Sequence, residues 1–168
     1  EVFSRGSALA LLGPDGKPNA GFIASHEKFV GIAKEGKAQL VFLGDSITAG
    51  WAGAGKEVWP KAFGQYEPAN FGIGGDRTQH VLWRIQNGEL AGYKPKAFVI
   101  MIGTNNMGQN TPEEIAAGVK AIIDERLDRL AALGEADVMA ELAFPMPVTV
   151  VGEMVGVPEE DRAWFRPL

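Results

Sequence analysis

The sequence predicts an open α/β fold, in which helices cover a parallel sheet. Short apolar runs, expected to be strands, alternate with segments of helical periodicity, and each run ends in a glycine-containing loop. The expected strands are residues 38–43, 69–72 and 96–102. A strand, loop and helix repeated in this order calls for right-handed crossovers, which place helices on both faces of the sheet. Ligands bind such sheets beyond the carboxyl ends of the strands, so the loops are expected to converge on one site.

Helices are expected in the segments between these strands. Residues 25–35 show helical spacing of apolar side chains, with Ser25 as a candidate N-cap and Gly36 as the terminator. Residues 47–63 are expected to contain a helix, although the glycines within this segment leave its limits open. Residues 78–88 place apolar side chains on one helical face, which predicts a helix packed against the sheet.

The last helix has the clearest start signal in the sequence. Thr111 is a typical N-cap residue, Pro112 takes the first helical position, and Glu114 completes a capping box with Thr111. We expect this helix to run to about residue 133.

Three parts of the chain differ in composition. Residues 1–20 are rich in turn-forming residues and predict an irregular arm. Residues 21–123 hold the expected α/β domain. Residues 124–168 carry 4 Lys and Arg against 10 Asp and Glu, whereas residues 1–123 carry 12 against 11. This shift in charge indicates that residues 124–168 differ from the domain, and their apolar spacing predicts a helical appendage.

Composition excludes several classes of function. The sequence has no cysteine, so disulfides, thiolate-bound metal or haem and a cysteine nucleophile are excluded. The net charge of −5 comes without a basic stripe, so we expect no nucleic-acid partner. No apolar window is long enough to predict a membrane-spanning helix. The chain begins at Glu1, and both a cytoplasmic and a secreted location stay open, as does the oligomeric state.

Each of the three loops contains a residue that could act in ester chemistry. Ser46 follows a buried strand at the start of a helix, where the helix N-terminus stabilises developing negative charge, although a serine there is more often an N-cap. The glycine loop of residues 72–76 could offer a backbone N–H to an oxyanion, and a plain glycine turn explains it equally well. An asparagine amide in the loop of residues 103–106 could be a second donor or could satisfy its own loop.

Taken together, the loop sequences VFLGDSITAGW, NFGIGGDRTQHVLWR and VIMIGTNNMG resemble the SGNH (GDSL-like) serine hydrolases in order and spacing. The second block is similar in particular to the branch around the platelet-activating-factor acetylhydrolase catalytic subunits. The resemblance covers residues 20–123 and implies a three-layer, flavodoxin-like parallel sheet that is truncated here. It also implies Ser46 as nucleophile, and an oxyanion hole made by the N–H groups of Ser46 and Gly75 and the side chain of Asn105. Such enzymes act on small acyl or acetyl esters without a cofactor.

A serine nucleophile needs a base, and the resemblance indicates that this base should come from a late Asp-x-x-His motif. The sequence holds two histidines, His26 and His80, and neither lies in such a motif. His80 is a candidate substitute base, while a structural role is the default for both. No cluster with metal-ligand spacing is present, so no metal is expected. Whether the chain is an enzyme therefore stays open: activity should be weak or absent, and a non-catalytic acyl- or sugar-binding module is the alternative.

Residues 125–168 resemble a different family. The string RLDRLAALGEADVMAELAFPMPVTVVGEMVGVPEEDRAWFRPL is similar to mid-region helices of bacterial cytochrome P-450 monooxygenases. Without a cysteine to ligate haem, no monooxygenase activity should follow. The family resemblance and the charge both change at one place, and the expected Asp-x-x-His motif is missing beyond it. Together these changes predict a chimeric or truncated chain, and a fragment without function is a further alternative.

Overall fold

A computed structural model describes residues 8–91 and 94–131 of the chain, with side chains up to residue 125. Residues 1–134 belong to one compact unit, and the second unit lies outside the described residues. The expected separate tail from residue 124 therefore stays a prediction. The helices and strands are α1 (Ala20–Glu35), β1 (Leu40–Gly44), α2 (Ser46–Ala49), α3 (Trp59–Phe63), β2 (Pro68–Gly72), α4 (Thr78–Arg84), β3 (Ala97–Met101) and α5 (Pro112–Ala131).

The predicted parallel α/β fold is confirmed. The described residues form a three-stranded sheet in the order β2-β1-β3, and β1 pairs in parallel with both neighbours. Residue Gly44 at the end of β1 is in register with Gly72 of β2 and Met101 of β3. All three carboxyl ends therefore lie at the same edge of the sheet, as the alternation of strands and helices predicts.

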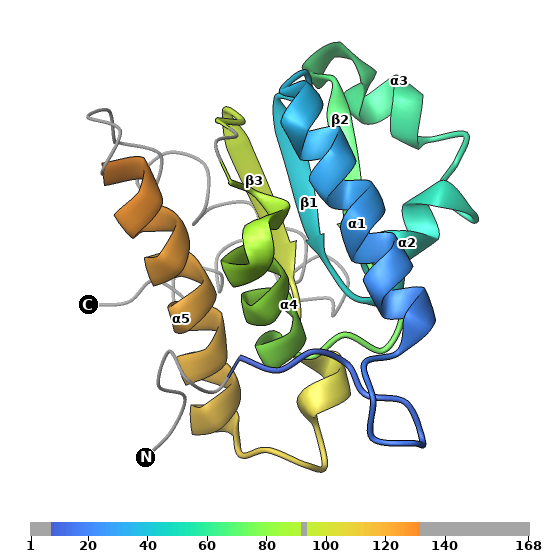
Figure 1. Cartoon of the computed structure of the whole chain (residues 1–168). Helices are drawn as coiled ribbons and strands as arrows, with labels where there is room; N and C mark the ends of the chain where they lie inside the picture. The colour runs from blue at the N-terminus through green and yellow to red at the C-terminus, as the bar shows by residue number, and fades with distance from the viewer. Residues whose placement is uncertain (1–7, 92–93, 132–168) are drawn as a thin grey trace, which may run out of the picture. The chain divides into compact units, whose positions relative to one another are not determined.

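The two faces of the sheet bury different sets of apolar side chains. Val41 and Leu43 of β1 belong to the main core, which α1, α4 and α5 cover with Phe22, Val81, Ile122 and other apolar side chains. Figure 1 shows α1 and α4 in front of the sheet, with α5 beside α4. Leu40 and Phe42 point to the opposite face, where Trp59 and Phe63 of α3 pack against them. Side chains alternate between faces along a strand, so each strand contributes to both layers of helices.

Helix α1 begins earlier than the sequence pattern predicts. The N-cap is Asn19, whose side chain accepts a hydrogen bond from the Phe22 N–H at 3.0 Å. Ser25, the expected N-cap, lies inside the helix. The predicted end is confirmed, because Gly36 is the C-cap with a left-handed φ of 68°. The additional residues place Phe22 over the sheet, where it is buried.

The single helix expected within residues 47–63 is instead two short helices. Helix α2 ends at Ala49 and continues as the 3₁₀ turn Gly50–Ala52, and α3 begins at Trp59 with Pro60 in its first turn. Glycine favours such breaks because it loses more backbone freedom than other residues in a helix. The Trp51 and Trp59 rings still pack together, with centroids 5.7 Å apart.

Helix α4 is shorter than predicted, and α5 starts as predicted. Helix α4 ends at Arg84 and passes into a π-helical turn, Ile85–Glu89, that includes Gly88 at a φ of 97°. At the start of α5, the capping box is present in both directions. The Glu114 N–H donates to Thr111 Oγ1 at 3.2 Å, and the Thr111 N–H donates to Glu114 Oε2 at 3.0 Å. Hydrogen bonds from Asn110 and Thr111 lower the pKa of Glu114.

The described part of the N-terminal arm, residues 8–19, has little regular structure. A tight turn closes it, with an isolated antiparallel bridge between Leu12 and Pro18. The Leu9 N–H donates to the Gln79 carbonyl at 3.3 Å, which attaches the arm to the first turn of α4. Among the residues that the structure describes, no helix has the length and apolar character needed to cross a membrane.

Candidate active site

The three loops at the carboxyl edge of the sheet converge, as the fold predicts. Asn105, in the loop after β3, donates from Nδ2 to the Asp76 carbonyl of the second loop at 2.8 Å. The same nitrogen lies 3.5 Å from Asp45 Oδ2 in the first loop. One amide therefore joins the loops that follow all three strands. This juncture defines the candidate site.

The first loop presents Ser46 to solvent on a rigid turn. Asp45, rather than Ser46, is the N-cap of α2: its Oδ1 accepts the Ile47 N–H at 2.9 Å, and its carbonyl accepts the Ala49 N–H. Asp45 is 1% exposed, whereas Ser46 is exposed. Because Asp45 caps the helix, the Ser46 hydroxyl is not used for capping, which removes the common structural explanation for a serine at this position.

The second loop is a tight glycine turn beside Ser46. The Asp76 N–H donates to the Ile73 carbonyl at 3.2 Å, and Gly75 has a φ of 81°, which a residue with a Cβ rarely adopts. A Cβ placed on Gly74 would lie 3.9 Å from Ser46 Cβ, so the turn is in van der Waals range of the nucleophile candidate. In the part of the chain that the structure describes, no backbone hydrogen bond takes up the Gly75 N–H.

Glycines also let the strand ends approach the start of α2. A Cβ on Gly72 would collide with the backbone of Ala49 and Thr48, and a Cβ on Gly44 would collide with Thr48 and the Met101 carbonyl. The Ile73 N–H donates to the Gly44 carbonyl at 3.1 Å, which extends the pairing of β1 and β2 into the loops. Close backbone approach, rather than flexibility, is thus the requirement for glycine at these two positions.

The third loop is held by Asn106, which sequence reasoning did not single out. Asn106 is fully buried; its Oδ1 accepts the Thr78 N–H at 3.0 Å, and its Nδ2 donates to Gln79 Oε1 and Asn110 Oδ1. The two adjacent asparagines thus have different roles. Asn106 fastens the loop to α4, and Asn105 is left to reach across to the other two loops.

His80 has contacts that give it a structural role. Its side chain is 3% exposed, and its Nδ1 accepts the Arg77 N–H at 3.0 Å, which fixes the first turn of α4. Burial, reinforced by the positive charges of Arg77 and Arg84, lowers its pKa from 6.5 to about 4. A nitrogen engaged as an acceptor on a weakly basic ring is poorly suited to take a proton from Ser46.

His26 lies in a buried group of charges that the sequence pattern did not reveal. Its Nδ1 is 3.2 Å from Glu89 Oε2, and Glu89 also accepts two hydrogen bonds from Arg84 Nη1. Arg84 Nη2 is 2.9 Å from Asp76 Oδ2. The side chains of Arg84, Glu89 and Asp76 are all fully buried. Burial raises the pKa of Asp76 to about 7, against the opposing effect of Arg84.

Comparison with known families decides what this arrangement belongs to. The GDSL-like lipase/acylhydrolase family matches residues 42–166, which is more than half of the chain. The chain belongs to this family. The family resemblance drawn from the loop sequences is therefore confirmed, and the match continues through the C-terminal part that was expected to have a different origin.

Curated relatives of this GDSL-like chain are subunits of platelet-activating factor acetylhydrolase IB. The alpha1 subunit of Homo sapiens and the alpha2 subunit of Rattus norvegicus are each 43% identical over 102 residues, which is 61% of this chain. The chain spans 43% of the length of each of these relatives.

Solved structures similar to this GDSL-like chain include a protein from Streptococcus pneumonia described as a platelet activating factor. It is 24% identical, with a TM-score of 0.49, over 67% of this chain and 51% of that one. Another is AlinE4, an SGNH-hydrolase family esterase, which is 24% identical with a TM-score of 0.44 over 56% of each chain.

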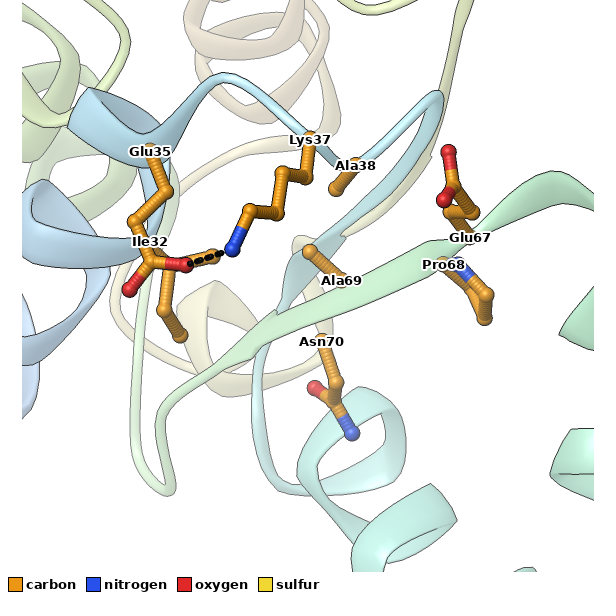
Figure 2. Close-up of a pocket in the computed structure, with 8 residues that line it drawn as sticks. All are labelled: Ile32, Glu35, Lys37, Ala38, Glu67, Pro68, Ala69 and Asn70. Atoms are coloured by element: carbon orange, nitrogen blue, oxygen red, sulfur yellow. Dashed lines mark hydrogen bonds and ion pairs between the residues drawn. The ribbon is translucent and has the colours of Figure 1, made fainter.

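A hollow elsewhere on the GDSL-like domain is a poorer candidate site. It has a volume of about 340 Å³ and lies at the amino ends of β1 and β2, beside Pro68 and the end of α1. Figure 2 shows the side chains that line it, among which Lys37 Nζ pairs with Glu35 Oε2 at 3.3 Å. The other lining residues are aliphatic, apart from Glu67 and Asn70, and the set forms no catalytic constellation. Among the described residues, no group of three or more His, Cys, Asp or Glu is placed to hold a metal ion.

Proposed function

We propose that this GDSL-like domain is a serine ester hydrolase scaffold for small acyl esters, with Ser46 as the nucleophile. The observation that carries the proposal is the Asn105 amide, which joins the loops of Asp45 and Asp76 beside the exposed Ser46. The Gly75 N–H then supplies one donor for the oxyanion that forms when Ser46 attacks an ester carbonyl. The second N–H of the Asn105 amide supplies another when it leaves its long, 3.5 Å contact with Asp45 Oδ2. Such donors are typically worth about 10²–10³-fold in turnover each.

The proposed scaffold has a nucleophile and donors but no evident base. His80 Nδ1 accepts the Arg77 N–H, so its Nε2 carries the ring proton, and His26 is paired with Glu89. Among the residues that the structure describes, no hydrogen bond joins either histidine to Ser46. His80 is the substitute-base candidate that a single substitution can test. We therefore infer that turnover is low, since loss of the histidine in a serine protease costs on the order of a millionfold.

The test is hydrolysis of a short aryl acetate by the wild-type chain, by Ser46→Ala and by Ser25→Ala. Ser25 lies in α1, away from the site, so Ser25→Ala is the matched control for loss of a serine hydroxyl. We expect wild type and Ser25→Ala to hydrolyse the ester at the same slow rate, and Ser46→Ala to fall to the rate of buffer. Equal rates for all three variants would contradict the assignment of Ser46.

Added imidazole gives a second test of the same proposal. If the scaffold lacks only its base, free imidazole should accelerate hydrolysis by wild type more than by Ser46→Ala, because the acceleration then passes through the Ser46 hydroxyl. His80→Gln is compared in the same assay. A Ser46-dependent rate that disappears in His80→Gln would identify His80 as the base after all.

A non-catalytic module that binds acyl or sugar groups is the second candidate, favoured because no hydrogen bond joins Ser46 to His26 or His80 in the described part of the chain. It predicts that a short-chain carboxylate binds the wild-type chain and that Asn105→Ala abolishes binding, with no Ser46-dependent hydrolysis. Isothermal titration with acetate and butyrate separates this function from slow catalysis.

We also propose, from sequence likeness alone, that residues 125–168 have the P-450-like origin that their sequence suggests. Against it stands the GDSL-like match, which extends to residue 166. A chain ending at residue 131 tests the proposal. If the tail is also a separate structural unit, the shortened chain should retain the cooperative unfolding of the α/β domain, and loss of that transition would show that the domain needs the tail.

A further inference from the structure

We propose that Arg84 is a positioning residue for the oxyanion donors, acting by clamping both ends of the glycine loop that presents them. This inference rests on the proposed function, because the importance of the donors depends on a reaction at Ser46. The structural part of the inference, that Arg84 orders the loop, can be tested without any turnover.

The contacts of Arg84 bracket the second loop. Both Nη1 and Nη2 donate to the Phe71 carbonyl at 3.1 Å, just before the glycines, and Nη2 pairs with the Asp76 carboxylate at 2.9 Å, just after them. The residues between are Gly72, Ile73, Gly74 and Gly75. One planar guanidinium thus holds the entry and the exit of a segment with three glycines.

Such a segment needs an external clamp to present a donor in one position. Glycine has more backbone freedom than any other residue, so a glycine-rich loop loses the most entropy when it is ordered. Within the turn, the Asp76 N–H donates to the Ile73 carbonyl. Arginine suits the role because its fork binds two acceptors in a fixed plane, which lysine cannot do.

Asp76 transmits the same constraint to Asn105. Its carboxylate is bound by Arg84, and its carbonyl accepts the Asn105 amide at 2.8 Å. A shift of the Asp76 backbone would therefore move the Gly75 N–H and the Asn105 side chain together. In this way Arg84, which is fully buried and does not itself reach the substrate, sets both donors.

A buried arginine with two carboxylates is a poor way to stabilise a core. Replacing buried ion pairs by apolar residues is often neutral or stabilising, so net stability alone does not explain the group. Glu89 neutralises Arg84 from the other side, and its second contact is with His26 of α1 rather than with the glycine loop. The Arg84–Asp76 pair is thus the part of the group that contacts the glycine loop. A substitution of Glu89 serves as the matched control.

The experiment compares Arg84→Lys, Asp76→Asn and Glu89→Gln with wild type at pH 8, where Asp76 is ionised. ¹⁵N relaxation gives the backbone order parameter of Gly75, and the Asn105 side-chain signals report the amide. We expect an order parameter of about 0.85 for Gly75 in wild type and Glu89→Gln, and below about 0.6 in Arg84→Lys and Asp76→Asn. Asp76→Asn and Glu89→Gln make the same carboxylate-to-amide change, so they differ only in which contact is lost.

Several outcomes would overturn the positioning role: a Gly75 already mobile in wild type, a Gly75 that stays ordered in Arg84→Lys and Asp76→Asn, or equal loosening in Glu89→Gln. If Arg84→Lys lacks a cooperative unfolding transition, the Asp76→Asn and Glu89→Gln pair decides alone.

Hydrolysis supplies the separate test of function. Where the wild type shows a Ser46-dependent rate, kcat should fall on the order of 10²-fold in Asp76→Asn with little change in KM. An ordered Gly75 without any Ser46-dependent rate would contradict the esterase proposal but would still support the positioning role of Arg84. The two failures are therefore distinguishable.

Discussion

Charged side chains are buried at the carboxyl end of the sheet and exposed at its amino end. At the carboxyl end, Asp45 and Asp76 are 1% and 0% exposed, and both are tied into the loops by hydrogen bonds or an ion pair. At the amino end, the Glu35 and Lys37 side chains, which line the hollow of Figure 2, pair with each other while 63% and 78% exposed. The hollow lies at the amino end, whereas the side chains that are held in one position lie at the carboxyl end.

This difference shows why a cavity alone is a poor guide to a site. An exposed ion pair costs little to rearrange, because water replaces each lost contact. A buried carboxylate that loses its partner has no such substitute. Groups that must hold one position for catalysis therefore belong at the carboxyl end, although a hollow lies at the amino end.

Removing one cationic side chain from each end gives the strongest test of the difference between the two ends. Arg84→Met leaves the Asp76 and Glu89 carboxylates buried without their partner, so we expect a loss of about 3–5 kcal/mol in the free energy of unfolding. Lys37→Met removes an exposed cation, and its effect should stay within about 0.5 kcal/mol. Urea unfolding of both variants measures the difference. Similar losses for the two would show that burial does not separate the ends.

The pH dependence of stability tests the buried group from a second direction. The pKa of Asp76 is raised from 3.8 to about 7, so folding favours its protonated form, and stability falls as the pH rises from 3.8 to 7. The pKa of His80 is lowered from 6.5 to about 4, so stability falls as the pH drops from 6.5 to 4. The two effects oppose each other in wild type, with Arg77, Arg84, Glu89 and Asp45 as the surrounding charges.

Single substitutions should separate these two effects. Relative to wild type, Asp76→Asn should lose about 3 kcal/mol more on acidification from pH 6.5 to 4, because only the His80 contribution remains. His80→Gln, which can still accept the Arg77 N–H, should gain stability over the same range. Urea unfolding at several pH values provides the curves. Parallel curves for all three chains would mean that neither group has the shifted pKa.

Glycine substitutions sharpen the comparison at the level of the backbone. A Cβ on Gly72 collides with the Ala49 and Thr48 backbone, so Gly72→Ala should cost about 1–3 kcal/mol. Gly64, at the far end of α3, has open space for an added methyl group and a helical φ of −53°, so Gly64→Ala should be neutral or slightly stabilising. Thermal unfolding of both variants measures this. A tolerated Gly72→Ala would show that the strand ends can separate without loss.

The strands and the loop residues were predictable because their signals are local. Apolar runs bounded by glycine locate β1, β2 and β3 to within two residues of the observed bounds, since the buried positions of a strand must be apolar. The loops that hold Ser46, Gly75 and Asn105 follow from their places after these strands, and the family resemblance singled out Gly75 and Asn105 within them. The start of α1 was wrong because Asn19 and Ser25 are both good N-caps, and the choice depends on packing of Phe22 against the sheet.

The buried charges were not predictable in the same way. Arg84 lies one residue before Ile85 and three after Val81, so its position on the apolar face of α4 is visible in the sequence. That pattern alone favours a charge that reaches solvent. Its burial follows from Asp76 and Glu89, which approach only because the chain turns after β2 and again at Gly88. The tertiary structure brings these partners to Arg84, whereas the sequence shows only that a charged residue lies on the apolar face of α4.

The capping box at α5 gives the smallest expected effect and tests whether a local signal acts independently of the site. Thr111 Oγ1 accepts the Glu114 N–H at the exposed start of the helix, so Thr111→Ala should cost about 1 kcal/mol. Thr111→Ser keeps the hydroxyl and should stay close to wild type. Asn110 contacts both Glu114 and Asn106, so loss of the cap at the start of α5 could change the position of the third loop. If the Asn105 side-chain signals shift in Thr111→Ala but not in Thr111→Ser, the helix start is part of the carboxyl-end arrangement; if they stay fixed, Asn106 holds the loop without it.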